Sequence, residues 1–107
     1  MKIINLTPHE VVLYKTDGSI LKLPKAETPL RLEQTTSQLK IIDGVSFTIT
    51  KYGLNNQTLP KVEEGTIYIV SKIFLKAFPS RLDFYMVNET VKDENGHIIG
   101  CKSLTRI

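Results

Sequence analysis

The chain has 107 residues, of which 41% are hydrophobic and 23% are charged. This length favours one domain with a single modest core, and the composition excludes a wholly disordered chain. No apolar run is long enough to span a bilayer, and the first ten residues lack the sustained apolar segment and cleavage site of a signal peptide. We therefore expect a cytoplasmic protein without a membrane partner.

The charges and the cysteine content narrow the choice of partners. The net charge is +3, and the lysines are scattered between apolar positions without interleaved aromatic residues. Such a distribution indicates a solvated surface and disfavours nucleic acid as a partner. The single cysteine, Cys101, excludes an intramolecular disulfide and fits a reducing compartment.

Short strands dominate the first part of the chain. Residues 3–6 favour a strand, and Pro8 interrupts it because proline lacks a backbone donor. Apolar-rich runs follow at residues 11–15 and 19–23, around Asp17-Gly18, a dipeptide typical of tight hairpins. A loop between two prolines comes next.

The middle of the chain predicts a second hairpin. Residues 31–42 are strand-like with a polar centre, which favours an edge strand or a strand with one wet face. After a turn at residues 43–44, residues 45–50 alternate between Val, Phe or Ile and Ser or Thr, the pattern of a half-buried strand. Residues 52–60 contain Gly, two Asn and Pro and are predicted as a loop.

A strand followed by a helix is predicted at residues 66–78. Residues 66–70 are β-branched or aromatic, and Ser71 stands where a helix N-cap belongs. The apolar residues after it, which are predicted to form one helix face, are Ile73, Phe74, Ala77 and Phe78. Pro79 ends the helix.

The last part returns to strands. Residues 82–87 favour a strand, residues 91–94 and 97–101 form a hairpin around Asn95-Gly96, and residues 102–107 form a polar tail. The expected fold is mainly β (α+β): a bent antiparallel sheet, or a small barrel-like pair of sheets, with one short helix closing an end. Exposed strand edges favour a homo-oligomer.

Three motifs carry a family resemblance. They are NLTPHEV from Asn5, EGTIYIVS from Glu64 and DENGHIIGC from Asp93, and together they resemble a family of small hypothetical proteins of bacteriophages and prophages. Arg81 and Asp83 match an Arg and an Asp of that family. The resemblance implies a phage protein acting in the host cytoplasm by binding, either by sequestering a host immune signal or by blocking a defence protein. It implies no catalytic residue.

The resemblance is interrupted at one place. Asn88-Glu89 stands where that family usually carries a Pro-Gly pair after the strand that contains Asp83.

Two groups of polar residues are candidates for a ligand site. Thr7 and His9 flank a rigid bend, where the imidazole could serve as a base or a donor, or the threonine hydroxyl could simply satisfy a local amide. Ser71, Arg81 and Asp83 lie at the two ends of the predicted helix. Arg81 could bind phosphate or carboxylate in a bidentate manner, or Ser71 could cap the helix while Arg81 pairs with Asp83.

Other chemistry finds little support in the sequence. His97 and Cys101 would lie more than about 10 Å apart on a strand, at ~3.3 Å per residue, which disfavours a Cys–His dyad. The pattern of Gly100-Cys101 favours a buried, inert thiol. Metal-ligand spacings and phosphate-binding glycine motifs are absent from the sequence, so we expect no cofactor.

The sequence thus predicts a non-enzymatic protein that binds a small anionic, nucleotide-like ligand through Thr7, His9, Ser71, Arg81 and Asp83. The alternative is a protein-interaction module, in which the strand at residues 31–42 docks a host or virion protein. An enzyme using His9 and Cys101 is the weakest of the three hypotheses.

Overall fold

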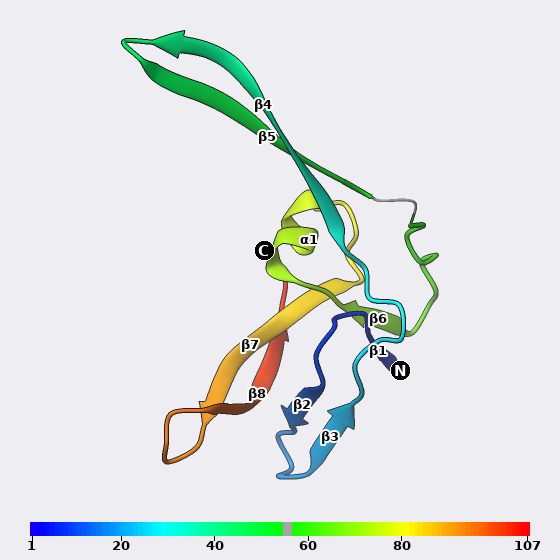
Figure 1. Ribbon diagram of the computed structural model, residues 1–107. Coiled ribbons are helices and arrows are strands. Elements are labelled where there is room, and N and C mark those ends of the chain that lie inside the picture. Colours follow the sequence, from blue (N-terminus) through cyan, green and yellow to red (C-terminus); the bar gives the residue numbers. More distant parts are fainter. Residues whose placement is uncertain (55–56) are drawn as a thin grey trace.

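The computed structural model describes residues 1–54 and 57–107 and confirms a mainly β fold, with 51% strand and 6% helix. Figure 1 shows the elements, with one hairpin standing apart from the rest of the chain. In chain order they are β1 (Lys2–Asn5), β2 (Val11–Tyr14), β3 (Ile20–Leu23), β4 (Leu32–Ile42), β5 (Val45–Leu54), β6 (Thr66–Ile69), α1 (Lys72–Ala77), β7 (Phe84–Lys92) and β8 (Ile98–Thr105).

Six of the strands form a nearly closed, barrel-like sheet in the order β1-β6-β7-β8-β2-β3. The pairs β2–β3 and β7–β8 are antiparallel, whereas β1–β6, β6–β7 and β2–β8 are parallel. Parallel pairs need crossover connections, and β6 and β7 are joined by one that contains α1, while the pairs β1–β6 and β2–β8 are joined by longer stretches of chain. Hydrogen bonds also link the end of one edge strand, β1, and the segment after it to the segment after the other edge strand, β3. The side-chain amide of Asn5 donates to the Pro24 carbonyl, and the backbone amide of Ala26 donates to the Thr7 carbonyl.

The core lies between this sheet and the helix. Phe74 and Leu75 of α1 are buried against Phe84 and Tyr68, and a second buried cluster contains Ile69 and Cys101. The predicted N-cap is confirmed, since the Ser71 hydroxyl accepts a hydrogen bond from the Phe74 amide. The predicted apolar face is wrong in part: Ile73 is 54% exposed and Ala77 is exposed as well, because the six-residue helix buries only one side of a single turn and a half.

The C-terminal hairpin is longer than the sequence suggested. β7 extends to Lys92 and β8 to Thr105, so most of the predicted polar tail is paired strand. Glu89 lies within β7 with a φ of 51°. This left-handed conformation is costly for a residue with a side chain and favours glycine.

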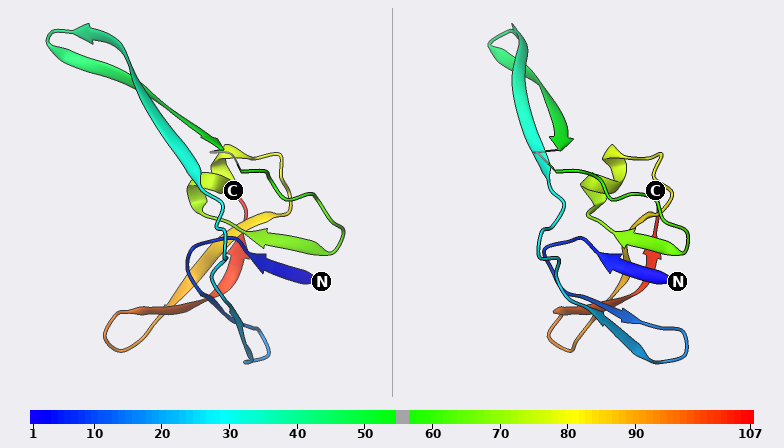
Figure 2. Two further views of the ribbon diagram at one scale, coloured as in Figure 1. Left: turned by 45° about the vertical axis from the view of Figure 1, so that its right-hand side comes forward. Right: turned by 90° about the vertical axis from the view of Figure 1, so that its right-hand side faces the viewer.

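The hairpin of β4 and β5, residues 32–54, is called the arm below. It projects from the sheet as a twisted two-stranded ribbon in all views (Figures 1 and 2), and β4 pairs only with β5 among the described strands. The expectation of a half-buried strand is wrong here: the alternation is present, but Val45, Phe47 and Ile49 are 56%, 43% and 39% exposed. No other layer within residues 1–54 and 57–107 covers them.

The predicted loop at residues 52–60 also starts later than expected. β5 continues to Leu54, since Tyr52 and Gly53 pair with β4. Residues 55–56 of that loop lie outside the described residues.

Candidate functional site

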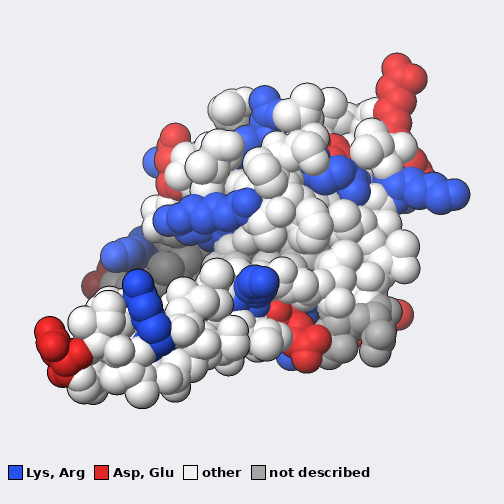
Figure 3. Space-filling view, turned by 90° about the horizontal axis from the view of Figure 1, so that it is seen from above, with Lys and Arg blue, Asp and Glu red and all other residues white. Residues whose placement is uncertain are grey.

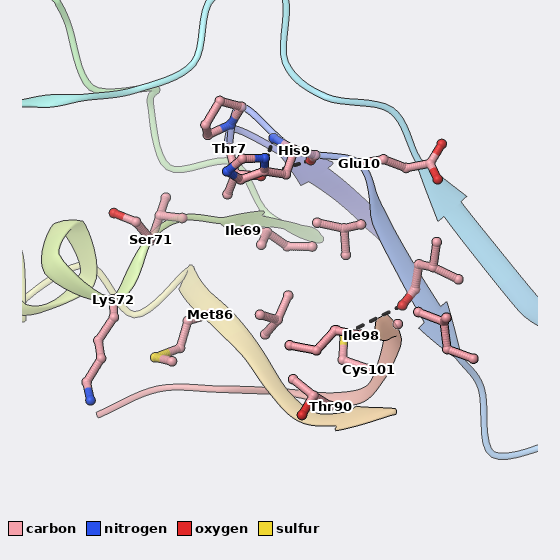
Figure 4. A pocket seen from close by; sticks show the side chains of 17 residues that line it. Thr7, His9, Glu10, Ile69, Ser71, Lys72, Met86, Thr90, Ile98 and Cys101 are labelled. Atoms are coloured by element: carbon pink, nitrogen blue, oxygen red, sulfur yellow. Dashed lines mark hydrogen bonds between the residues drawn. The ribbon is translucent and has the colours of Figure 1, made fainter. Parts of the chain in front are cut away.

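A cavity of about 620 Å³ lies between the turn after β1, the end of β6, and the β7–β8 hairpin. Figure 4 shows Thr7 and His9 on one side, Ser71 and Lys72 at another, and Met86, Ile98 and Cys101 across from the turn. The walls are largely aliphatic, and their apolar side chains come from Val11, Val12, Ile69, Val70, Met86, Val87, Ile98 and Ile99. A mainly apolar cavity with a few polar groups at its margin is the usual form of a small-molecule site.

The turn that carries His9 is built around Asn5. The Asn5 Nδ2 donates to the carbonyls of His9 (2.7 Å) and Pro24 (3.1 Å). Its Oδ1 accepts from the Thr7 amide (3.0 Å) and the Thr7 hydroxyl (2.7 Å). All four hydrogen-bonding positions of this 7% exposed amide are therefore used.

This network decides the role of Thr7. Its hydroxyl donates to the Asn5 Oδ1 and lies 3.1 Å from the His9 carbonyl, so it stabilises the turn. The local amide that the structural interpretation of the sequence expected it to satisfy is that of His9, whose nitrogen lies 3.5 Å from the hydroxyl oxygen. His9 itself is exposed at the cavity margin. The strand end and the Asn5 network thus fix the backbone of His9 while its imidazole stays accessible.

Ser71 and Lys72 supply the polar groups on the other side. The Ser71 hydroxyl lies 3.2 Å from the Phe74 amide, and its oxygen is engaged in capping α1. Lys72, also exposed, is the one lysine among the described residues that line the cavity. In Figure 4 the Glu10 carboxylate extends away from Ser71 and Lys72, which leaves the ammonium as the nearer charge on that side.

Arg81 and Asp83 are not among the described residues that line the cavity. They bind each other in a bidentate pair, with Nε–Oδ1 at 2.9 Å and an Nη–Oδ2 contact at 2.8 Å, and their side chains are only 14% and 10% exposed. The guanidinium also lies 4.3 Å from the centre of the Phe84 ring. Thr7, His9 and Ser71 therefore line one cavity, whereas Arg81 and Asp83 form an ion pair beside the core.

The pair changes the titration of both groups. Hydrogen bonding to Arg81 lowers the pKa of the Asp83 carboxyl below its ordinary value of 3.8. The same bonds raise the pKa of the Arg81 guanidinium. Both residues therefore stay charged and mutually satisfied at neutral pH, which suits a structural role better than ligand exchange.

The remaining candidates for chemistry are dispersed. Cys101 is 3% exposed, its Sγ lies 3.7 Å from the Val12 carbonyl, and burial raises the pKa of its thiol. The thiol is thus buried as predicted, whereas the side chain of His97 is 79% exposed beside Asp93. Within residues 1–54 and 57–107, no three His, Cys, Asp or Glu side chains come together in a way that could hold a metal ion.

Two residues of this site were missed in the sequence. Asn5 had a usable signal, because an asparagine two residues before a Thr-Pro bend commonly accepts from a nearby amide. Lys72 had no signal, since nothing distinguishes it from the other scattered lysines. The space-filling view agrees with that scatter, because the basic side chains on the face it shows are spread over it and several lie beside acidic ones (Figure 3).

Comparisons of the chain with models of protein families, with curated proteins and with solved structures gave no match. In the part of the chain that is described, no helix has the length and apolar character to cross a membrane.

Proposed function

We propose that this chain is a non-enzymatic binding protein that takes a small anionic, nucleotide-like ligand into the cavity between the His9 turn and the β7–β8 hairpin. The cavity itself carries the proposal: about 620 Å³ lies within the ~300–1,000 Å³ typical of small-molecule sites. The aliphatic walls suit the face of a base. The margin offers an ammonium from Lys72, an imidazole from His9 and a hydroxyl from Ser71.

The binding residues in this proposal are His9, Ser71 and Lys72, and Thr7 holds the turn that presents His9. Arg81 and Asp83 serve the fold, because their hydrogen bonds are satisfied within the pair. The resemblance to small phage proteins supplies the biological context, in which the protein would act in the host cytoplasm by sequestering a defence signal. Such a role needs tight binding and no turnover.

The first experiment is native mass spectrometry of the purified protein, alone and with a panel of nucleotides and cyclic nucleotides. A retained or acquired mass that is stoichiometric with the chain supports the proposal. Rejection of every nucleotide contradicts it.

A matched pair of variants then tests the location of the site. Lys72→Ala removes the lysine at the cavity, and Lys76→Ala removes an exposed lysine of the same helix that does not line it. By titration calorimetry we expect Lys72→Ala to weaken binding about tenfold, or ~1.4 kcal/mol, and Lys76→Ala to leave it unchanged. Equal effects of the two variants would place the ligand elsewhere.

The exposure of β4 supports the second candidate function, a module that docks a host or virion protein at residues 31–42. The outer edge of β4 pairs with no described strand, and such an edge can accept a further strand. This function predicts a stable complex with another protein in host lysate and no small molecule retained after purification.

A further inference from the structure

One face of the arm is apolar along its outer half. Residues directly opposite in an antiparallel pair share a face, and here Val45 pairs with Ile42, Phe47 with Lys40, and Ile49 with Ser37. Ile42, Val45, Phe47 and Ile49 therefore form a stripe, called the arm stripe below, whose members are 39–56% exposed. The opposite face is polar around Thr36, Gln38, Thr48 and Thr50, although it also carries Ile41, which is 61% exposed beside Ser46 near the tip.

A hairpin of this kind needs a covering layer. Two strands alone are at best marginally stable in water, and a stable sheet requires more strands or a packed apolar face. Within the described chain only the base of the arm packs on the core, through Leu32 and Leu54. The outer half of the arm receives no such support from the residues that the structure describes.

The size of the exposed surface shows how much cover is missing. A compact monomer of 12.1 kDa exposes about 6,000 Å², whereas this chain exposes 7959 Å². The excess of about 1,900 Å² is more than twice the ~800 Å² that each partner buries in a standard protein–protein interface. The radius of gyration, 17.3 Å, likewise exceeds the ~13 Å expected for this length.

From these observations we infer that the arm stripe is a homodimer interface, in which the arms of two copies pack face to face and antiparallel about a twofold axis near Phe47. An isologous interface places identical surfaces together, and the apolar arm stripe can pack on its own copy. Lys40, opposite Phe47 on the same face, is exposed, so its long side chain can lie along the edge of the interface with its ammonium in water. Phe47 lies at the centre, where Val45 and Ile42 of one copy meet Ile49 of the other.

Charge complementarity at the two ends of the interface favours this register. Lys51 lies on the same face as Phe47, about 13 Å further along β5 at ~3.3 Å per residue. Asp43 begins the turn between β4 and β5 at the tip of the arm, four positions from Phe47 in the other direction. In the antiparallel dimer Lys51 of each copy therefore faces Asp43 of the other, and neither forms an ion pair with a described residue of its own chain.

The test is the mass in solution, measured by light scattering after size exclusion and by sedimentation. We expect the wild-type chain at twice 12.1 kDa. Phe47→Glu should give a monomer, because it places a charge at the centre of the interface. Thr48→Glu makes the same change one residue along, on the polar face, and should remain a dimer.

A charge cycle tests the partner and the register. Lys51→Glu should raise the dimer dissociation constant about tenfold through repulsion from Asp43 of the other copy. Adding Asp43→Asn should recover most of that loss, and asparagine tolerates the φ of 51° at this turn. Circular dichroism of each variant checks that the barrel-like sheet is intact.

Three results would overturn the inference. The first is a wild-type chain that stays at 12.1 kDa, which would point to a different protein as the partner of the arm. The second is an equal effect of Phe47→Glu and Thr48→Glu on the mass in solution. The third is a dissociation constant that does not recover in the double variant. Nucleotide binding in the cavity is measured independently, because no residue of the arm lines it.

Discussion

Replacing Asn5 by aspartate tests the network that holds the His9 turn. The substitution keeps the shape of the side chain but replaces the Nδ2 donor with a second oxygen. At neutral pH that oxygen carries no proton and faces the carbonyls of His9 and Pro24, which the native amide contacts at 2.7 and 3.1 Å. Two donor contacts thus become repulsive ones at a site that is 7% exposed.

The magnitude follows from the two lost hydrogen bonds and from the unsatisfied groups they leave. Each bond contributes about 0.5–1.5 kcal/mol, and each buried acceptor left unpaired costs about 1–3 kcal/mol. Because these terms overlap, we expect Asn5→Asp to lower the free energy of unfolding by about 3 kcal/mol at pH 7. With a urea slope of about 1.5 kcal/mol per molar, the midpoint should fall by about 2 M.

The loss should depend on pH in a defined direction. The carbonyls raise the folded-state pKa of the new carboxyl above its unfolded value, because the protonated acid can again donate one hydrogen bond. Relative to wild type, the variant therefore gains stability as the pH falls through that raised pKa and loses it as the pH rises.

Urea unfolding of wild type and variant at pH 7 and at pH 4 measures both effects. Asn88→Asp is the matched control, since the Asn88 side chain is exposed and, among the described residues, hydrogen-bonds the Ser103 hydroxyl alone; it should change stability by less than about 0.5 kcal/mol. The explanation is refuted if Asn5→Asp is no worse than this control, or if its deficit is the same at the two pH values.

Three further predictions concern the sheet and the ion pair. Gly100→Ala should lower the unfolding free energy by about 1–3 kcal/mol in urea, because a Cβ there would lie 2.9 Å from the Val12 carbonyl and 2.5 Å from the Tyr14 ring; an unchanged midpoint would contradict this. Glu89→Gly should raise the midpoint of thermal unfolding slightly. Glycine relieves the strain of the left-handed φ, about 1–2 kcal/mol, and this gain exceeds its entropic cost of ~0.5–1 kcal/mol. A lower midpoint would show that the Glu89 side chain stabilises the fold by more than the strain costs. Asp83→Asn should lower the free energy of unfolding by about 2 kcal/mol at pH 7. This deficit should shrink as the pH falls below the ordinary carboxyl pKa of 3.8, because the wild-type protein loses its ion pair when Asp83 protonates at its lowered pKa. A deficit independent of pH would exclude the ion pair as its cause.

Local chemistry made most of the elements predictable. Asp17-Gly18 and Asn95-Gly96 direct tight turns wherever they stand, since glycine accepts the positive φ of 87° and 80° found at these positions. Ser71 capped the helix as predicted, because a hydroxyl at that position reaches the third amide beyond it regardless of the surrounding fold. The alternation at residues 45–50 likewise predicted a strand correctly.

The site was less predictable because cavities depend on contacts between distant segments. Thr7 and Ser71 are 64 positions apart, and they share one cavity only because β1 pairs with β6 in parallel. The sequence alone allowed Arg81 and Asp83 to bind either a ligand or each other. In the folded chain the short turn between α1 and β7 places the two side chains next to each other beside Phe84, and they form the ion pair.

The sequence by itself determined where the chain turns, which segments extend and where the helix begins, because these depend on backbone preferences within a few residues. Only the tertiary structure decided which strands pair, which polar groups meet at the cavity, and that no other described part of the chain covers the apolar face of the arm. A period of two says that one face of a strand is apolar. What covers that face depends on the position of the strand in space, which no short stretch of sequence specifies.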